Sequence, residues 1–344
     1  MTQLSDVMSY GQRWQNVASY ATLFLVSELF YRPLIKFEGV APGFSIDHRL
    51  RGIKIFQDII PRSVFAFVNS EEFLEYPRPI SHKIIFVGGI GVSKPNPLAE
   101  EYKRIMDNAK GAVVLISFGS VAKSSEMPSN IKDAFVGMFA QLPEVTFIWK
   151  YEVDDDIGAN FTNVIKKKWV PQNDLFAHPK LSAFVTHGGQ NSVTESTHAG
   201  IPMICMPLFG DQMRNAKMAE KRNVALIVDK KEITADRLTV AVRTVLYNQT
   251  YGFSAKRLAQ MINSKPISAR DRVVKYAEFA AEFGPFDNLD SAGVKLSFIQ
   301  YYLIDIIVPG LVIFVLLFIL SIYICVRLAR LLWRFCLRSK PKKE

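Results

Sequence analysis

The sequence is poor in cysteine and has no cluster of metal-binding side chains. It contains three cysteines, and Cys325 and Cys336 belong to a long apolar segment near the C-terminus or to the tail that follows it. Cys205 is then the one thiol in the rest of the chain, which excludes a disulfide bond there. No Cys and His residues have the spacing of a zinc site, so we expect no metal.

The fingerprint of nicotinamide-dependent dehydrogenases is also missing. It requires G-x-G-x-x-G directly after the first strand of the nucleotide-binding unit. The nearest sequence has Gly89 and Gly91 but places Lys94 at the third glycine position. A dehydrogenase of this type is therefore excluded.

No export signal is visible at the N-terminus. The semi-apolar stretch Val17 to Leu29 contains Glu28, follows Asp6 and lacks a small-residue cleavage pattern. We interpret it as an amphipathic helix. Because the body is predicted below to lie across a membrane, the missing signal suggests that the chain is an N-terminally truncated version of a longer protein.

Positive charge is concentrated at one end of the chain. The formal net charge is +10, and the residues from Arg327 to Glu344 hold seven of the 42 basic and one of the 32 acidic side chains. The rest of the chain therefore has 35 basic and 31 acidic residues, a net charge of +4. A globular nucleic-acid binder carries its excess charge on the fold, so we expect no nucleic-acid partner.

A run of 21 uncharged residues, Ile306 to Val326, predicts a transmembrane helix. At about 1.5 Å per residue it spans the ~30 Å hydrocarbon core of a bilayer. Tyr301, Tyr302 and Trp333 stand where interfacial aromatic residues belong. The alternative, a buried core helix, is disfavoured by this length and by these flanks.

The basic tail sets the expected topology. Lys and Arg gather on the cytosolic side of membrane proteins, which predicts a cytosolic tail and a lumenal body. The sequons at Asn160 and Asn248 agree with a lumenal body. Lys340 and Lys342 resemble the dilysine retrieval signal of endoplasmic reticulum membrane proteins, so we predict a single-pass protein of that membrane.

Between Asn108 and Tyr247, apolar β-rich runs alternate with helical stretches. Strands are expected at Ala112 to Phe118, Thr146 to Tyr151, Val164 to Val170, Ala183 to Thr186, Pro202 to Met206 and Ala225 to Val228. Helices are expected at Ser129 to Gln141, Ser192 to Ala199, Gln212 to Lys221 and Thr234 to Tyr247. This alternation predicts a doubly wound α/β domain with a parallel sheet, whose ligands bind at the carboxyl ends of the strands.

One group of unusual residues follows the fourth expected strand. His187 is followed by two glycines, and a helix is expected to begin near Gln190. The free N–H groups of a helix start suit a diphosphate. Asn191 and Glu195 are four residues apart and so share one helix face. When the stretch Val185 to Ser192 is taken alone, an ordinary glycine-rich turn explains it equally well.

Three other strand ends carry related side chains. Trp169 is able to stack on a planar base and Gln172 to pair with a base edge, although a core tryptophan with a polar turn is the simpler interpretation in isolation. Ser117 to Ser120 offers small residues and free amides. Asp211 and Gln212 suit sugar hydroxyls, and a helix N-cap explains Asp211 as well. The conjunction of four such strand ends favours a ligand site.

The stretch Trp169 to Gln212, with WVPQNDLFAHPKL, FVTHGGQNSVTES and AGIPMICMPLFGDQ, resembles the signature of the UDP-glucuronosyltransferase and UDP-glycosyltransferase family (glycosyltransferase family 1). Weaker similarity runs from NSEEFLEYPRPI and VGGIGV to the membrane anchor. Phe176, Ser196 and Thr197 depart from residues common in the family, and none is a proposed ligand contact.

The resemblance implies the C-terminal, Rossmann-like donor domain of the two-domain GT-B fold. Trp169 would stack on uracil, Gln172 would contact the uridine and Glu195 the ribose. The residues around the diphosphate would be Ser117, Gly119, His187, Gly189 and Asn191. Asp211 and Gln212 would hold the sugar hydroxyls. UDP-sugar would be a co-substrate, with no separate cofactor.

The family's catalytic base is a histidine of the N-terminal domain, and this sequence has none in that context. His48 and His82 are interpreted as surface or structural residues, as are His178 and His198. The run Lys166 to Lys168 is most simply a solvated strand edge. No residue of this chain is therefore predicted to be the catalytic base.

The prolines and glycines between Pro77 and Pro97 indicate a boundary and linker. The predicted parts are a remnant of the N-terminal acceptor domain with its linker (1–92), a UDP-sugar-binding domain (93–285), a connecting segment (286–305), the transmembrane helix (306–326) and the tail (327–344).

The leading hypothesis is metal-independent, inverting transfer of glucuronic acid or glucose from a UDP-sugar to the hydroxyl of a small lipophilic acceptor. The alternative is a non-catalytic UDP-sugar-binding subunit that associates with full-length family members as a homo- or hetero-oligomer.

Overall fold

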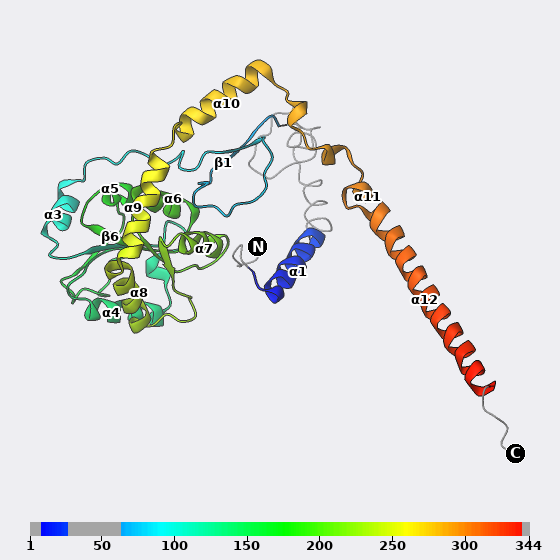
Figure 1. Ribbon diagram of the computed structural model, residues 1–344. Helices are drawn as coiled ribbons and strands as arrows, with labels where there is room; N and C mark the ends of the chain where they lie inside the picture. Colours follow the sequence, from blue (N-terminus) through cyan, green and yellow to red (C-terminus); the bar gives the residue numbers. More distant parts are fainter. Residues whose placement is uncertain (1–7, 27–62, 339–344) are drawn as a thin grey trace. The chain divides into compact units, whose positions relative to one another are not determined.

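A six-stranded parallel sheet organises the first of two units, Met1–Pro285 (Figure 1). The computed structural model describes residues 8–26 and 63–338. The strands are β3 (Val113–Ser117), β4 (Thr146–Lys150), β5 (Val164–Lys167), β6 (Leu181–Thr186), β7 (Met203–Cys205) and β8 (Ala225–Ile227). Their spatial order is β5-β4-β3-β6-β7-β8. All six predicted strands are present.

The order in which the chain adds its strands reverses at the middle of this parallel sheet. β3, β4 and β5 proceed to one side and β6, β7 and β8 to the other. β3 and β6 are therefore neighbours, and the connections that follow them lead to opposite sides of the sheet. Such a switch point is where doubly wound sheets bind their ligands. The predicted α/β fold class is confirmed.

Helices cover both faces of the sheet, and its central strands are therefore buried on both sides. Val113 and Leu115 of β3 pack into one core, whereas Val114 and Ile116 pack into another. The first core includes residues of α3 (Glu100–Asn108), α5 (Gln172–Phe176), α6 (Gln190–Ala199), α7 (Gln212–Lys221) and α9 (Gln249–Asn263). The second includes residues of α4 (Ser129–Gln141) and α8 (Ala235–Tyr247).

The second core contains a group of packed rings, here called the aromatic cluster. Trp149 of β4 stacks on Phe135 with ring centroids 5.6 Å apart and meets Phe139 and Tyr151 edge-on. Phe139 also contacts Phe147 at 4.9 Å. Contacts of this kind add to the stability gained from burying the rings.

A two-stranded parallel sheet precedes the large one. It consists of β1 (Ala66–Val68) and β2 (Ile84–Phe86). β2 lies between the prolines and glycines that were predicted to mark a boundary and linker. A strand of three residues is too short to show the alternation by which strands are detected in a sequence.

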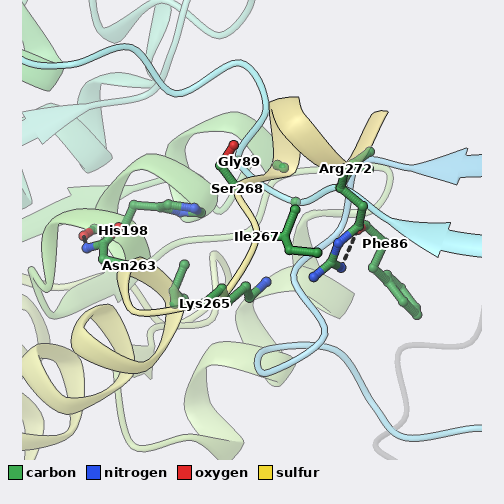
Figure 2. Close-up of a pocket in the computed structure, with 12 residues that line it drawn as sticks. Phe86, Gly89, His198, Asn263, Lys265, Ile267, Ser268 and Arg272 are labelled. Carbon is green, nitrogen blue, oxygen red and sulfur yellow. Dashed lines mark hydrogen bonds between the residues drawn. The ribbon is translucent and has the colours of Figure 1, made fainter. Parts of the chain in front are cut away.

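Ion pairs fasten this segment to the junction of α9 and α10 (Ala269–Phe283). Lys265 Nζ lies 2.7 Å from a carboxylate oxygen of Glu71 and 2.8 Å from one of Glu72. Arg272 donates a hydrogen bond of 2.9 Å to the carbonyl of Phe86, marked by a dashed line in Figure 2. The same region lines a cavity of about 220 Å³.

The second unit, Phe286–Glu344, contains α11 (Phe298–Tyr301) and α12 (Ile304–Arg338). Within α12, the 30 residues Ile304–Trp333 are long and apolar enough to cross a membrane, and none is buried against protein. The predicted transmembrane segment lies inside this helix. The helix continues beyond Val326, so the first residues of the predicted basic tail are helical.

The N-terminal helix α1 (Tyr10–Val26) overlaps the predicted amphipathic segment. None of its residues is buried. The end of the predicted segment, up to Leu29, lies outside the described residues, as does His48.

Candidate functional site

The loops after β3 and β6 meet around the imidazole ring of His187. A Cβ added to Gly119 would stand 3.0 Å from His187 Cε1, and one added to Gly189 would stand 2.4 Å from Nε2. Gly119 also has a φ of +80°, which favours glycine. Ser117, at the end of β3, is buried, and its hydroxyl accepts a 3.4 Å hydrogen bond from the Gly119 amide. The glycines thus make room for the ring.

Helix α6 begins at this point. Gly189 is its N-cap residue and offers no side chain to the free amides of the first turn. Asn191 is exposed in that turn. Free N–H groups and the helix dipole favour an anion there. The residues predicted to surround a diphosphate, Ser117, Gly119, His187, Gly189 and Asn191, thus lie in the two loops that meet here and in the first turn of α6, and their binding of an anion stays a prediction.

His187 is held in its uncharged form at neutral pH. Burial lowers the pKa of the imidazole, and the opposing effect of the Asp211 carboxylate is smaller. Its Nδ1 lies 3.4 Å from the hydroxyl oxygen of Thr186. A neutral imidazole has one N–H to donate. His187 is thus suited to donate a hydrogen bond to an anionic oxygen.

Gln172 and Glu195 are in direct contact. The amide nitrogen of Gln172, the first residue of α5, donates a 2.6 Å hydrogen bond to Oε2 of Glu195 in α6. Both side chains are half-buried. Glu195 also lies one helical turn beyond Asn191, as the sequence predicted. These two elements place a carboxylate and an amide side by side, an arrangement that suits a diol.

Trp169 is 70% exposed and lies two residues beyond the end of β5. Its backbone is fixed, because the Tyr102 hydroxyl donates a 2.6 Å hydrogen bond to the Trp169 carbonyl. Lys150 Nζ lies 5.8 Å from the centre of the ring. A large exposed ring on a fixed backbone offers a platform for stacking.

Asp211 and Gln212 have different surroundings. Asp211 is exposed, and its Oδ2 accepts a 2.8 Å hydrogen bond from Asn215. Gln212 is 4% exposed, and its Oε1 accepts hydrogen bonds from the amides of Leu208 and Phe209. Gln212 therefore holds the loop, while Asp211 is open to a ligand. Asp211 occupies the N-cap position of α7, but its side chain does not cap the helix.

Two polar residues near the site were missed by sequence reasoning. Lys150, at the end of β4, is buried and donates a 2.8 Å hydrogen bond to the Gly119 carbonyl. Asn215 donates to the carbonyl of Gly188 as well as to Asp211. A signal existed for Lys150, because a cation ends the otherwise uncharged strand TFIWK.

The neighbouring lysines serve the fold. Lys166 pairs with Asp155 at 2.8 Å, Lys168 pairs with Asp154 at 2.5 Å, and Lys167 pairs with Glu101. The charge of the run predicted as a solvated strand edge is thus matched within the protein.

The described histidines outside the site have other surroundings. His178 Nε2 lies 3.4 Å from Asp107. His198 Nδ1 contacts the Thr194 carbonyl at 2.8 Å, and its ring packs against Gly89. His82 is exposed just before β2. Among residues 8–26 and 63–338, no three His, Cys, Asp or Glu residues are grouped to hold a metal ion.

Comparison with known proteins identifies the family. The profile described as "UDP-glucoronosyl and UDP-glucosyl transferase" matches residues 1–343. This chain belongs to that family. The family predicted from the residues around Trp169 and His187 is thus confirmed.

Several curated family members are similar over most of the chain. UDP-glucosyltransferase 2 of Dactylopius coccus is 35% identical over 83% of this chain and 55% of its own length. UDP-glucuronosyltransferase 1-2 of Mus musculus is 34% identical over 89% and 56%, and UDP-glucuronosyltransferase 1A6 of Homo sapiens is 33% identical over 89% and 56%. The chain therefore spans about half the length of the curated relatives it matches.

A solved structure shares the fold. The glycotransferase of kitacinnamycin superposes with a TM-score of 0.52 at 22% identity, over 62% of this chain and 55% of that one. This likeness supports the GT-B type of the α/β architecture.

Proposed function

We propose that the site binds a UDP-sugar and that the protein transfers the sugar to the hydroxyl group of a small lipophilic acceptor. The observation that carries this proposal is the assembly, at one switch point, of the Trp169 platform, the Gln172–Glu195 pair and the glycine-lined His187. An exposed ring, a carboxylate–amide pair and a helix start with free amides suit a base, a ribose and a diphosphate. Glucuronic acid and glucose are the sugars proposed.

Each part of the donor has a proposed partner. Uracil stacks on Trp169, the ribose hydroxyls bind Glu195, and Gln172 contacts the uridine. The diphosphate lies among Ser117, Gly119, His187, Gly189 and Asn191. The sugar hydroxyls bind Asp211, and Gln212 contributes through its amide nitrogen, because its oxygen already accepts two backbone hydrogen bonds.

The proposed chemistry is a direct displacement at the anomeric carbon, with inversion and without a metal. As the bond to UDP breaks, negative charge grows on the departing phosphate oxygen. The first-turn amides of α6 and a hydrogen bond from neutral His187 would stabilise that charge. Removal of the acceptor proton requires a general base. We assign that role to none of the residues described above.

The surroundings proposed for this reaction are those of the endoplasmic reticulum membrane. Helix α12 would be its single span, the sheet domain would lie in the lumen and the basic tail in the cytosol. We retain the division into an acceptor-side segment (1–92), a donor domain (93–285), a connection (286–305), a membrane segment (306–326) and a tail (327–344). Association with other family members is proposed as well.

Binding and transfer are tested separately on the full chain in detergent. Calorimetry should show binding of UDP and of a UDP-sugar and much weaker binding of ADP. Radiolabelled UDP-sugars with a panel of phenols and steroids then report transfer. If ADP bound as well as UDP, the proposed uridine site would be wrong. Binding without transfer under all conditions would instead favour a donor-binding subunit.

Topology has its own test. Protease added to intact microsomes should remove a C-terminal epitope, and an epitope that stays protected would contradict the proposed orientation. Replacing Lys340 and Lys342 by Ser should let the protein leave the endoplasmic reticulum. The unchanged protein is the control in the same cells.

A further inference from the structure

Lys150 lies between two parts of the proposed donor site. It is the last residue of β4, which pairs with β3 on one side and with β5 on the other. Its register partner on β5 is Lys167, two residues before Trp169. On the other side, β3 ends at Ser117, and Gly119 lies two residues beyond that end. The strand order thus places this one side chain between the stacking platform and the anion site.

The ammonium group contacts both parts. Nζ donates a 2.8 Å hydrogen bond to the Gly119 carbonyl and a 2.9 Å hydrogen bond to Oε1 of Glu152, and it lies 5.8 Å from the centre of the Trp169 ring. These two bonds use two of its three N–H donors. Cation–π attraction at this distance favours one orientation of the exposed ring.

This arrangement is unfavourable for stability alone. Lys150 is 6% exposed, and removing an ammonium group from water opposes folding even when a carboxylate is near. Apolar side chains of similar volume often replace buried ion pairs with no loss of stability. Glu152 stays ionised, because hydrogen bonds from Lys150 and from the Ser125 amide outweigh burial and lower its pKa. A buried cation at a ligand edge is therefore better explained by a ligand.

We propose that Lys150 is a positioning residue of the donor site that joins the Trp169 platform to the Gly119 loop and directs its third N–H to the diphosphate. This inference rests on the proposed function. It assigns the site a positive side chain to match the two phosphates, in addition to the amides of α6. The chemical class recognised is a nucleoside diphosphate, as opposed to a nucleoside.

Three variants and a matched control test this role on the full chain in detergent. Lys150→Met is combined with Glu152→Gln, so that no buried carboxylate is left unpaired. Lys150→Arg keeps the charge, and Lys150→Gln removes it. The control is Lys166→Met, because Lys166 also pairs with a carboxylate, that of Asp155, and lies 5.0 Å from an aromatic ring, that of Tyr151. Calorimetry measures the binding of UDP and uridine to each.

The double variant and Lys150→Gln should bind UDP about 10- to 100-fold more weakly, the loss expected for one charge-assisted hydrogen bond. Uridine binding should change by less than about threefold in the same proteins, which also shows that they are folded. Lys150→Arg and Lys166→Met should bind UDP within about threefold of the unchanged protein.

Unchanged UDP affinity in both neutral variants, or equal loss of UDP and uridine, would overturn the role of Lys150 and leave the proposed function standing. Loss of UDP binding in Lys150→Arg as large as in Lys150→Gln would also overturn it. If the unchanged protein bound no UDP, the proposed function itself would fall, and this inference with it.

Discussion

Two tryptophans twenty residues apart show how differently one sheet uses the same side chain. Trp149 in β4 is 0% exposed and is enclosed by the rings of the aromatic cluster. Trp169, after β5, is 70% exposed at the carboxyl edge. β4, which contains Trp149, and β5, which Trp169 follows, are direct neighbours. Position relative to the strand, more than residue type, separates a core tryptophan from an exposed one.

The backbone around each ring agrees with this difference. Trp149 lies within the paired part of its strand, between Ile148 and Lys150. Trp169 lies two residues beyond the last paired residue of β5, so its ring extends past the sheet. Loss of the first ring should therefore affect folding, and loss of the second should affect binding.

The largest effect is expected from Trp149→Ala. Replacing a fully buried tryptophan in a core leaves a cavity and lowers the free energy of unfolding by about 3 to 5 kcal/mol. Denaturant titration followed by far-UV circular dichroism measures this change. A loss below about 1 kcal/mol would mean that the cluster closes over the gap.

Trp169→Ala should give the opposite result. Stacking of a base on an aromatic side chain contributes about 1 to 3 kcal/mol, so UDP binding should weaken by that amount. The free energy of unfolding should stay within about 0.5 kcal/mol, because the ring is exposed. UDP and UDP-sugar should lose equally. Unequal losses in calorimetry would contradict a contact made by uracil alone.

Asp211→Asn sharpens the contrast within the exposed edge. The variant should weaken UDP-sugar binding by about 1 kcal/mol, the usual net value of a hydrogen bond, and should leave UDP unchanged. Asn keeps the shape of the side chain and is able to accept the hydrogen bond of Asn215 through its oxygen. Equal effects on UDP and UDP-sugar would contradict the assignment of Asp211 to the sugar.

The smallest expected effect is a pH dependence of the free energy of unfolding that comes from His187, at the carboxyl edge of the sheet. Burial lowers the pKa of His187 in the folded protein, so below about pH 6.5 the unfolded chain takes up a proton first. Stability should therefore fall as the pH drops from about 6.5 toward the folded pKa, and it should be unaffected by this group above 6.5. His187→Gln should lose less stability over that range. Parallel pH curves for both proteins would contradict a buried, neutral His187.

Sequence reasoning was most successful where periodic patterns and strand ends agree. The predicted bounds of α4 and α7 coincide with the observed helices, and the residues around Trp169, His187 and Glu195 do meet at one edge. The contact between Gln172 and Glu195 joins residues 23 positions apart, and no local pattern predicts its distance.

What the sequence could not supply depends on tertiary contacts. Lys150 is an ordinary strand residue until the fold brings Gly119 and Trp169 to it. The hydrogen bond that the Gln212 oxygen accepts from the Leu208 amide depends on the path of the loop before α7. Strands β1 and β2 are too short for their alternation to be read, and their pairing joins residues far apart in the chain.

The two glycines that flank the His187 ring have a consequence for natural variation. An alanine at Gly189 would collide with the ring at 2.4 Å, and one at Gly119 would meet it in a backbone conformation that L-residues rarely adopt. Both positions lie in loops at the edge of the sheet. An allele carrying either change should disturb the proposed donor site more than the rest of the sheet, so screens based on expression level alone would not reveal it.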